Sequence, residues 1–232
     1  AELGIPAVGI TDLNGVYGLP RAFEVLKHIP NIKLISGSEL TLKDHPPISL
    51  IARDRDAYGI MCRILSASHF GKEKGDAHLL LSELIAHLEN PKAQGLIAIP
   101  HLTPMTRIAL LKELFPSRLY LPLCRYLDGL DDKRTAFAVE QSTHFEVPIV
   151  AHNDVHYARP ERRRLQDCLT AIREGTTVKE AGFKLFGNAE RHLKSPIQMR
   201  SLFKDLPSAI HSTLDIAQSF TFKLSDLSYM YP

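Results

Sequence analysis

Tryptophan is absent from this sequence, and cysteine and long apolar runs are scarce. The three cysteines, Cys62, Cys124 and Cys168, are odd in number and widely separated. Without a Cys-x-x-Cys pair they argue against a disulfide framework or a zinc ribbon, and they favour a reducing, cytoplasmic environment. No apolar run approaches membrane-spanning length and no signal peptide is visible, so we expect no membrane partner.

The remaining composition is that of an ordinary globular protein. The 232 residues are 44% hydrophobic and 23% charged, which is enough for one large or two small domains with a substantial core. A net charge of +2 does not by itself indicate nucleic-acid binding. Eleven histidines are more than usual, so metal or proton chemistry is worth considering. Because the chain opens without Met, in what reads as the last turn of a helix ending at Gly4, we expect a fragment.

Short apolar runs alternate with helical patterns up to residue 151. This spacing predicts parallel βα units, as in an α/β barrel. The predicted strands are 6–11, 32–36, 47–52, 95–99, 119–123 and 147–151. After residue 160 the pattern becomes helical, with an amphipathic helix over 161–173 that carries Leu165, Cys168, Leu169 and Ile172 at helical spacing. Further helices are predicted over 196–203 and 207–218.

The last predicted strand runs into a cluster of histidines around an aspartate. On an extended chain, His152, Asp154 and His156 would share a face, because alternate side chains point the same way. Imidazole and carboxylate together suit zinc, manganese or iron. The alternative is an ordinary polar strand end that leads into a loop.

Other predicted strands also end at polar residues that could bind metal or phosphate. In α/β barrels the carboxyl ends of the strands carry the active site, and a cation would neutralise carboxylates gathered there. The alternative is that these residues cap the following helices. The residues are Asp12, Glu39, His101, Arg125 and the pair Asp154 and His156.

Eight further motifs follow one another along the chain. They are Gly9-Ile10-Thr11-Asp12, Gly15-Val16-Tyr17-Gly18, Ser36-Gly37-Ser38-Glu39-Leu40, Leu50-Ile51-Ala52-Arg53-Asp54, Gly95-Leu96-Ile97-Ala98, Val150-Ala151-His152-Asn153-Asp154-Val155-His156-Tyr157, Asn188-Ala189-Glu190-Arg191-His192-Leu193-Lys194-Ser195 and Leu227-Ser228-Tyr229-Met230-Tyr231-Pro232. Taken in order, these motifs resemble the N-terminal PHP (polymerase and histidinol phosphatase) domain of the bacterial C-family DNA polymerases, the DNA polymerase III alpha subunits. The 188–195 motif is most similar to the error-prone branch of that family.

The resemblance implies a fold and a division of the chain. The fold is α/β, a distorted seven-stranded, TIM-like β/α barrel over residues 1–160, followed by a helical segment over 161–232 that leads to the polymerase palm domain. The first strand, which carries a His-x-His in this family, would lie upstream of Ala1 and be missing here.

The resemblance also implies a set of site residues and cofactors. An active site of this family holds up to three divalent ions (Zn, Mn or Mg) and acts as a phosphoesterase or a 3′–5′ exonuclease. The implied metal ligands are Asp12, Glu39, Asp154 and His156, with His101 and His152 as further candidates. Leu13 stands where the family has a histidine, so we expect a degenerate site. Phosphate or DNA contacts are expected at Arg125, Arg159, Arg162 and Arg163, although such a charge cluster is often only a solvated helix face.

The function implied is that of a DNA polymerase fragment, with DNA-templated nucleotidyl transfer for replication or error-prone repair in the parent protein. The expected partners are DNA and a proofreading exonuclease subunit or sliding clamp. Two alternatives remain. One is a free-standing phosphatase, such as a histidinol phosphatase. The other is a structural module that docks an exonuclease, which the replacement by Leu13 favours.

Overall fold

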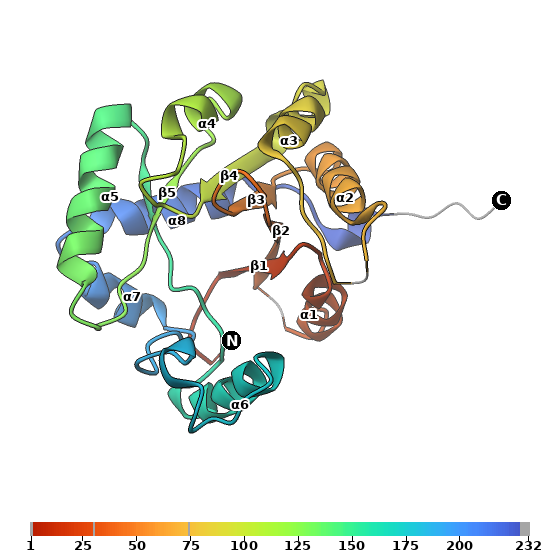
Figure 1. The fold of residues 1–232 in the computed structure, drawn as a ribbon. Coiled ribbons are helices and arrows are strands. Elements are labelled where there is room, and N and C mark those ends of the chain that lie inside the picture. Colours follow the sequence, from red (N-terminus) through yellow and green to blue (C-terminus); the bar gives the residue numbers. More distant parts are fainter. Residues whose placement is uncertain (1, 30, 74, 228–232) are drawn as a thin grey trace.

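Six strands alternate with helices in the computed structural model, which describes residues 2–29, 31–73 and 75–227. The strands form the centre of the molecule, and most of the helices cover them from outside (Figure 1). The strands are β1 Ala7–Leu13, β2 Lys33–Leu40, β3 Ile48–Ala52, β4 Leu96–Pro100, β5 Leu121–Leu123 and β6 Ile149–Ala151. The α-helices are α1 Gly18–Leu26, α2 Arg55–His69, α3 Leu81–Leu88, α4 Ile108–Leu114, α5 Asp131–Phe145, α6 Arg163–Arg173, α7 Pro196–Leu202 and α8 Pro207–Ser219.

The strands form a four-stranded sheet in the order β1-β2-β3-β4 and a two-stranded sheet of β5 and β6. A single parallel bridge between Ala98 and Leu119 connects β4 to the residues before β5. The described residues therefore form a mixed α/β fold with a four-stranded and a two-stranded sheet, and the seven-stranded barrel that the resemblance implies stays a prediction.

Strand β3 runs antiparallel to both of its neighbours, whereas β1 with β2 and β5 with β6 are parallel. The prediction of parallel units throughout is therefore wrong for β3. Residues 41–47, between β2 and β3, are too few for the crossover that a parallel neighbour requires. Since β2 and β4 both oppose β3, these two strands still point the same way, and their carboxyl ends lie at one edge of the sheet.

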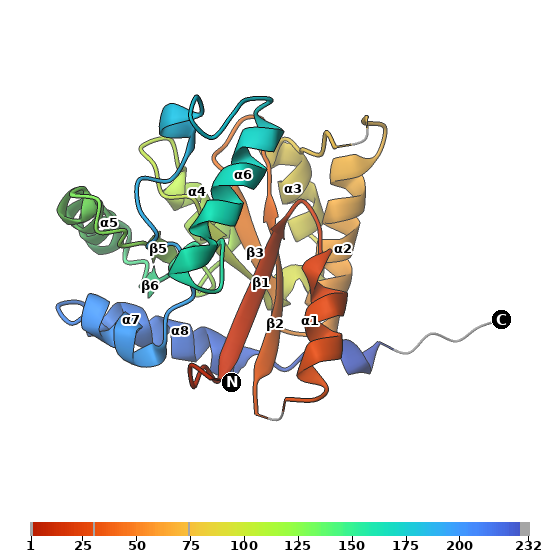
Figure 2. The same cartoon turned by 90° about the horizontal axis from the view of Figure 1, so that it is seen from below.

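The main core lies between the four-stranded sheet and helices α2, α3 and α4 (Figures 1 and 2). Leu50 and Leu96 of the sheet and Met61 and Ile64 of α2 are all fully buried there. Helix α2 begins where the Asp54 carboxylate accepts a hydrogen bond of 2.8 Å from the amide of Ala57. This packing fixes the strand ends that carry the candidate site.

Two smaller apolar clusters join the C-terminal helices to the strands. Phe203, just after α7, packs with Leu123 of β5 and Ala151 of β6. Ile216 of α8 and Phe222 pack with strand residues that include Val150. Apolar packing therefore continues across the boundary predicted at residue 160.

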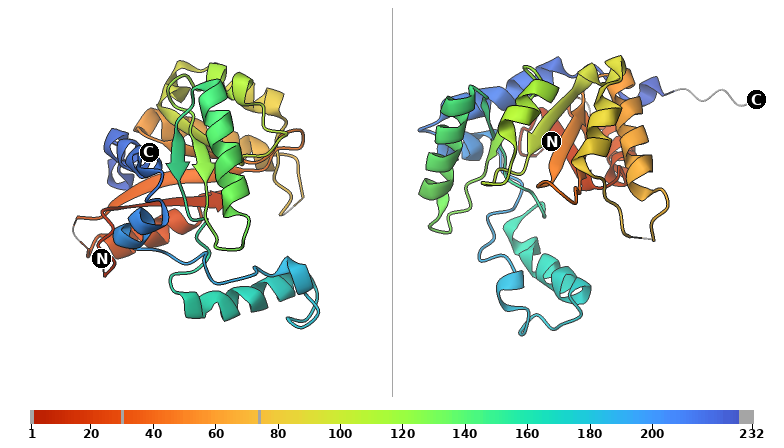
Figure 3. Two further views of the ribbon diagram at one scale, coloured as in Figure 1. Left: turned by 90° about the vertical axis from the view of Figure 1, so that its left-hand side faces the viewer. Right: turned by 45° about the horizontal axis from the view of Figure 1, so that its top comes forward.

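Helix α6 lies apart from the other helices (Figure 3). The prediction of a helix here is confirmed, but its apolar stripe is not covered by the described residues, and the side chain of Ile172 is 75% exposed. Instead Thr170 and Ala171 are buried, so a small and partly polar surface faces the protein. No helix of residues 2–29, 31–73 and 75–227 is long and apolar enough to cross a membrane.

Candidate functional site

Glu39 and His101 meet at the carboxyl ends of β2 and β4. His101 Nε2 lies 2.9 Å from Glu39 Oε2. The hydrogen bond with His101 lowers the pKa of Glu39, and the same bond raises the pKa of His101. The pair therefore favours a negative carboxylate and a positive imidazole, in accord with the predicted convergence of strand-end residues.

The histidine cluster after β6 is not an extended strand. Strand β6 ends at Ala151, and Asp154 has a left-handed backbone with φ of 41°. The alternation predicted for residues 152–156 is therefore wrong, because a residue with positive φ turns the chain. The turn nevertheless brings His156 Nε2 to 3.4 Å from Asp154 Oδ1.

His152 lies behind this turn and serves it structurally. Its Nδ1 accepts a hydrogen bond of 2.9 Å from the Asp154 amide. Burial lowers the pKa of His152 to about 4, which keeps the ring neutral and able to accept that bond. Burial also lowers the pKa of His156.

Asp12 lies at the same end of the sheet as Glu39 but on the other face. In the parallel register Leu13 stands opposite Glu39, and directly paired residues point to the same face. The Asp12 carboxylate instead accepts a hydrogen bond from the amide of Gly18, the first residue of α1. The position on the Glu39 side is therefore held by Leu13, which is 60% exposed and has no metal-binding atom.

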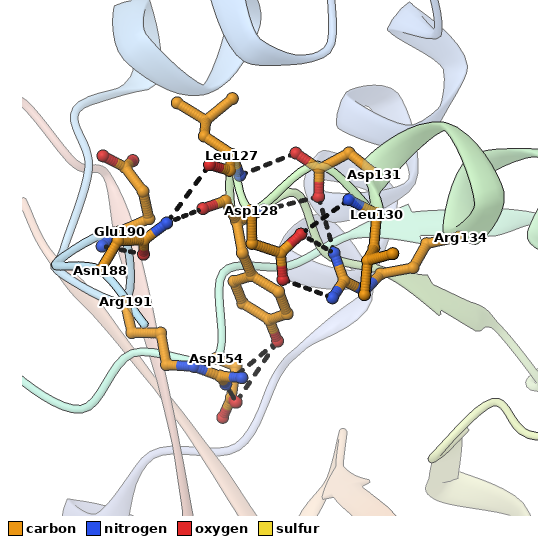
Figure 4. Close-up of polar contacts among 10 residues, drawn as sticks. Leu127, Asp128, Leu130, Asp131, Arg134, Asp154, Asn188, Glu190 and Arg191 are labelled. Carbon is orange, nitrogen blue, oxygen red and sulfur yellow. Dashed lines mark hydrogen bonds and ion pairs between the residues drawn. The ribbon is translucent and has the colours of Figure 1, made fainter. Parts of the chain in front are cut away.

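Two residues that the sequence reasoning did not place in the site, Tyr126 and Arg191, lie directly on Asp154. Arg191 forms an ion pair with Asp154 Oδ2 (Figure 4). Tyr126 Oη lies 3.4 Å from the same oxygen. The sequence signal for Arg191 is its position in the Asn188-to-Ser195 motif, which indicates the family but no contact.

The PHP domain family matches residues 1–113. Residues 1–113, just under half of the chain, thus resemble a PHP domain. Over its whole length it is also similar to the N-terminal PHP region of error-prone DNA polymerases, which confirms the family resemblance seen in the sequence.

These relatives are much longer than this chain. The error-prone DNA polymerase of Bradyrhizobium diazoefficiens is 37% identical over 99% of this chain and 21% of the relative. The error-prone DNA polymerase of Rhodopseudomonas palustris is 38% identical over 100% of this chain and 21% of the relative. That of Pseudomonas aeruginosa is 36% identical over 100% of this chain and 22% of the relative. The chain thus spans about a fifth of these relatives. The predicted palm junction at residues 227–232 lies outside the described residues, except for Leu227.

Among solved structures, PsfC from Pseudomonas syringae PB-5123 aligns with 66% of this chain and 63% of its own. The identity is 14% and the TM-score 0.41, which is too low to carry an argument about fold or function.

The ligands expected of the PHP domain are only partly gathered: Glu39 lies close enough to His101, His152 and His156 for their charges to lower its pKa. Within the part of the chain that the structure describes, no group of three or more His, Cys, Asp or Glu side chains is arranged to hold a metal ion. Glu39 is paired with His101, Asp154 with Arg191, and Asp12 with the Gly18 amide. Divalent ions in catalytic sites require three or more such donors with a position left open, so these residues do not fit one as they stand.

The arginines predicted to contact phosphate are mostly engaged by the protein itself. Arg125 donates to both carboxylate oxygens of Asp205, at 2.5 and 2.7 Å, and to the carbonyl of Leu202. Arg159 pairs with Glu2 at 3.1 Å, and Arg163 lies 3.6 Å from Asp167. Arg162 is exposed on the 3₁₀ turn Pro160–Arg162 that precedes α6.

The Arg125–Asp205 pair should make stability depend on pH. The hydrogen bond from Arg125 lowers the pKa of Asp205 from 3.8 to about 2. The folded pKa is below the unfolded one, so the stabilisation is present above about pH 4 and is lost as the pH falls through about 2. Since Asp205 is 56% exposed, this contribution should be under about 1 kcal/mol.

The measurement is the melting temperature of the wild type and of Asp205→Asn across that interval. We expect Asp205→Asn to lose less stability on acidification than the wild type. Glu113→Gln, at an exposed carboxylate, is the control and should follow the wild type. An equal loss in Asp205→Asn and the wild type would contradict this assignment.

Proposed function

We propose that this chain is the PHP-domain segment of an error-prone DNA polymerase III alpha subunit. The observation that supports this best is the similarity of the whole chain, at 36–38% identity, to about a fifth of the length of such polymerases. The parent protein would carry out DNA-templated nucleotidyl transfer, with its catalytic carboxylates outside these residues. DNA as substrate, a proofreading exonuclease or sliding clamp as partner, and a cytoplasmic location belong to the same proposal.

The segment's own chemistry would be, at most, weak metal-assisted phosphoester hydrolysis. The Asp12 carboxylate is engaged by the first residue of helix α1. The donors that remain near the strand ends are Glu39, His101, Asp154 and His156. Their pairing within the protein and the presence of Leu13 favour a structural role for the site. A two-metal phosphoesterase must clamp both the attacking and the leaving oxygen, which needs more ligands than these.

The proposal includes one further strand, with a His-x-His, beside β1. Among the described strands, β1 and β6 each pair with a neighbour on one side only. A strand placed between these two edges would bring the number to seven, as in the barrel of this family, and would add two imidazoles to the ligand set.

The test is to purify the chain and measure metal content, hydrolysis of single-stranded DNA and nitrophenyl phosphate, and primer extension. We expect no extension, at most one weakly bound divalent ion, and negligible hydrolysis. A second protein, extended upstream in its gene, should regain metal affinity partly, and the extended Leu13→His variant should regain more, because residue 13 lies on the Glu39 face.

Template-dependent extension by the chain alone would contradict the domain assignment. Robust manganese- or zinc-dependent hydrolysis, abolished by Asp154→Ala, would contradict the ligand count instead. The matched control is Asp128→Ala, since Asp128 is an acidic residue paired with Arg134 outside the proposed ligand set.

A further inference from the structure

Residues 188–194, which we call the strap, lie directly against the turn that carries Asp154. The Asn153 side-chain amide donates to the carbonyls of Glu190 and His192, at 3.2 and 2.5 Å. In the backbone, the His156 amide donates to the Arg191 carbonyl, and the Leu193 amide to that of Tyr157, each at 3.0 Å. These bonds fix the Cα of Arg191 beside the turn.

Further side chains hold the two ends of the strap. Asn188 Nδ2 donates to the carbonyl of Tyr126 at 2.5 Å. At the other end Lys194 Nζ donates to Asn153 Oδ1 at 3.2 Å and pairs with Glu190 at 3.1 Å. Asn153 and Lys194 are both 8% exposed, so these polar contacts are shielded from water.

The Arg191 guanidinium contacts two aromatic rings. Its Cζ lies 4.0 Å from the centroid of the Tyr126 ring and 4.2 Å from that of Phe186. Its Nη1 donates to Tyr126 Oη at 3.1 Å and forms the ion pair with Asp154. The side chain is 20% exposed. Contact with both rings leaves the group little freedom to move away from the carboxylate.

The charge at this position is permanent. A guanidinium is not deprotonated in proteins, so Asp154 faces a fixed positive charge at every pH of interest. A divalent ion on Asp154 would meet that charge at contact distance, where water reaching the 41%-exposed Asp154 side chain screens it only in part. Because His156 Nε2 lies 3.4 Å from Asp154 Oδ1, it would bind the same ion and meet the same repulsion.

We propose that Arg191 is a built-in cation that takes the place of a divalent ion at Asp154, and that the strap excludes metal from this carboxylate. Arg191 is thus a positioning residue that fixes Asp154 and the turn around it. The inference rests on the proposed function only in the choice of a divalent ion as the competitor.

The experiment is calorimetric titration of the chain with Mn²⁺ alone, together with chemical unfolding in EDTA. Arg191→Gln keeps the length and polarity of the side chain but removes its charge. We expect it to lower the folding equilibrium constant about tenfold in EDTA, from the lost ion pair and ring contacts. We expect Mn²⁺ affinity to rise by about tenfold or more, because the competing charge is gone.

Three further variants make the result specific. Arg191→Lys retains a positive charge and should keep the wild-type Mn²⁺ affinity. Adding Asp154→Asn to Arg191→Gln should remove the gained affinity. Arg159→Gln breaks an exposed ion pair with Glu2 and should change neither quantity.

A folded Arg191→Gln with wild-type Mn²⁺ affinity would overturn the proposal. A second measurement does not depend on the folding of that variant: Asp154→Asn, in the otherwise wild-type chain, should leave Mn²⁺ affinity unchanged. A clear loss of affinity in that single variant would show that Asp154 is already available to metal, and would also overturn the proposal. Neither readout involves hydrolysis or primer extension, so failure here is distinguishable from failure of the proposed function.

Discussion

Phe203→Ala is expected to lower the free energy of unfolding by about 3–5 kcal/mol, the usual loss for a buried phenylalanine. The Phe203 side chain is fully buried against Leu123 and Ala151. The Arg125 guanidinium lies 4.8 Å from the centroid of its ring. Truncation therefore leaves a cavity between α7 and the strands β5 and β6, which the measurement would register as a lower urea midpoint.

The shape of the unfolding curve is as informative as its midpoint. Because the Phe203 cluster contains residues from both sides of residue 160, we expect one cooperative transition that shifts as a whole. Leu214→Ala, at a side chain of α8 that is 45% exposed, should cost no more than about 0.5 kcal/mol. Two transitions, with only one moved by Phe203→Ala, would show that residues 161–232 unfold as the separate unit predicted from the sequence.

Arg125→Ala is expected to cost about 1–3 kcal/mol through lost hydrogen bonds and packing. The Arg125 side chain is only 11% exposed, and its guanidinium joins the end of β5 to Leu202 and Asp205. The cost stays below that of breaking a fully buried ion pair, because Asp205 remains half-exposed and can be hydrated. Urea unfolding at neutral pH measures it.

Arg159→Ala is the matched control, since Arg159 was also predicted to contact phosphate but is 71% exposed. It should change the unfolding free energy by no more than about 0.5 kcal/mol. If instead Arg125→Ala leaves stability unchanged while weakening binding of single-stranded DNA, the predicted phosphate role of Arg125 would be supported over its structural one.

The sequence predicted the positions of the strands well because each is a short apolar run. The directions of the strands were less accessible. Hydrophobic pattern does not encode strand direction, and the antiparallel course of β3 follows from the shortness of residues 41–47. The convergence of Glu39 with His101 could be predicted because they lie at the carboxyl ends of β2 and β4, which point the same way.

The finer geometry of the site was beyond the sequence for identifiable reasons. Asp12 and Leu13 are neighbours, and a shift of one residue along a strand exchanges the two faces. The left-handed backbone at Asp154 turned a predicted extended segment into a loop. Arg191 contacts Asp154 although helix α6 lies between them in the sequence. Contacts between residues so far apart in the sequence leave no periodic signal. The family resemblance supplied candidate ligands, but not the residues that engage them.

The strap also has a consequence for how the chain can change length during evolution. The chain leaves the turn at Tyr157 and returns at the strap, where Tyr157 and His192 form a bridge. Residues 158–187, which we call the excursion, thus leave and rejoin the rest of the chain at this bridge. Ion pairs such as that of Glu174 with Lys184 lie within the excursion. Away from Phe186 and Arg159, which contact residues outside the excursion, we expect insertions and deletions to leave β6 and α7 in place. This part of the chain can therefore diverge while the strap keeps its register.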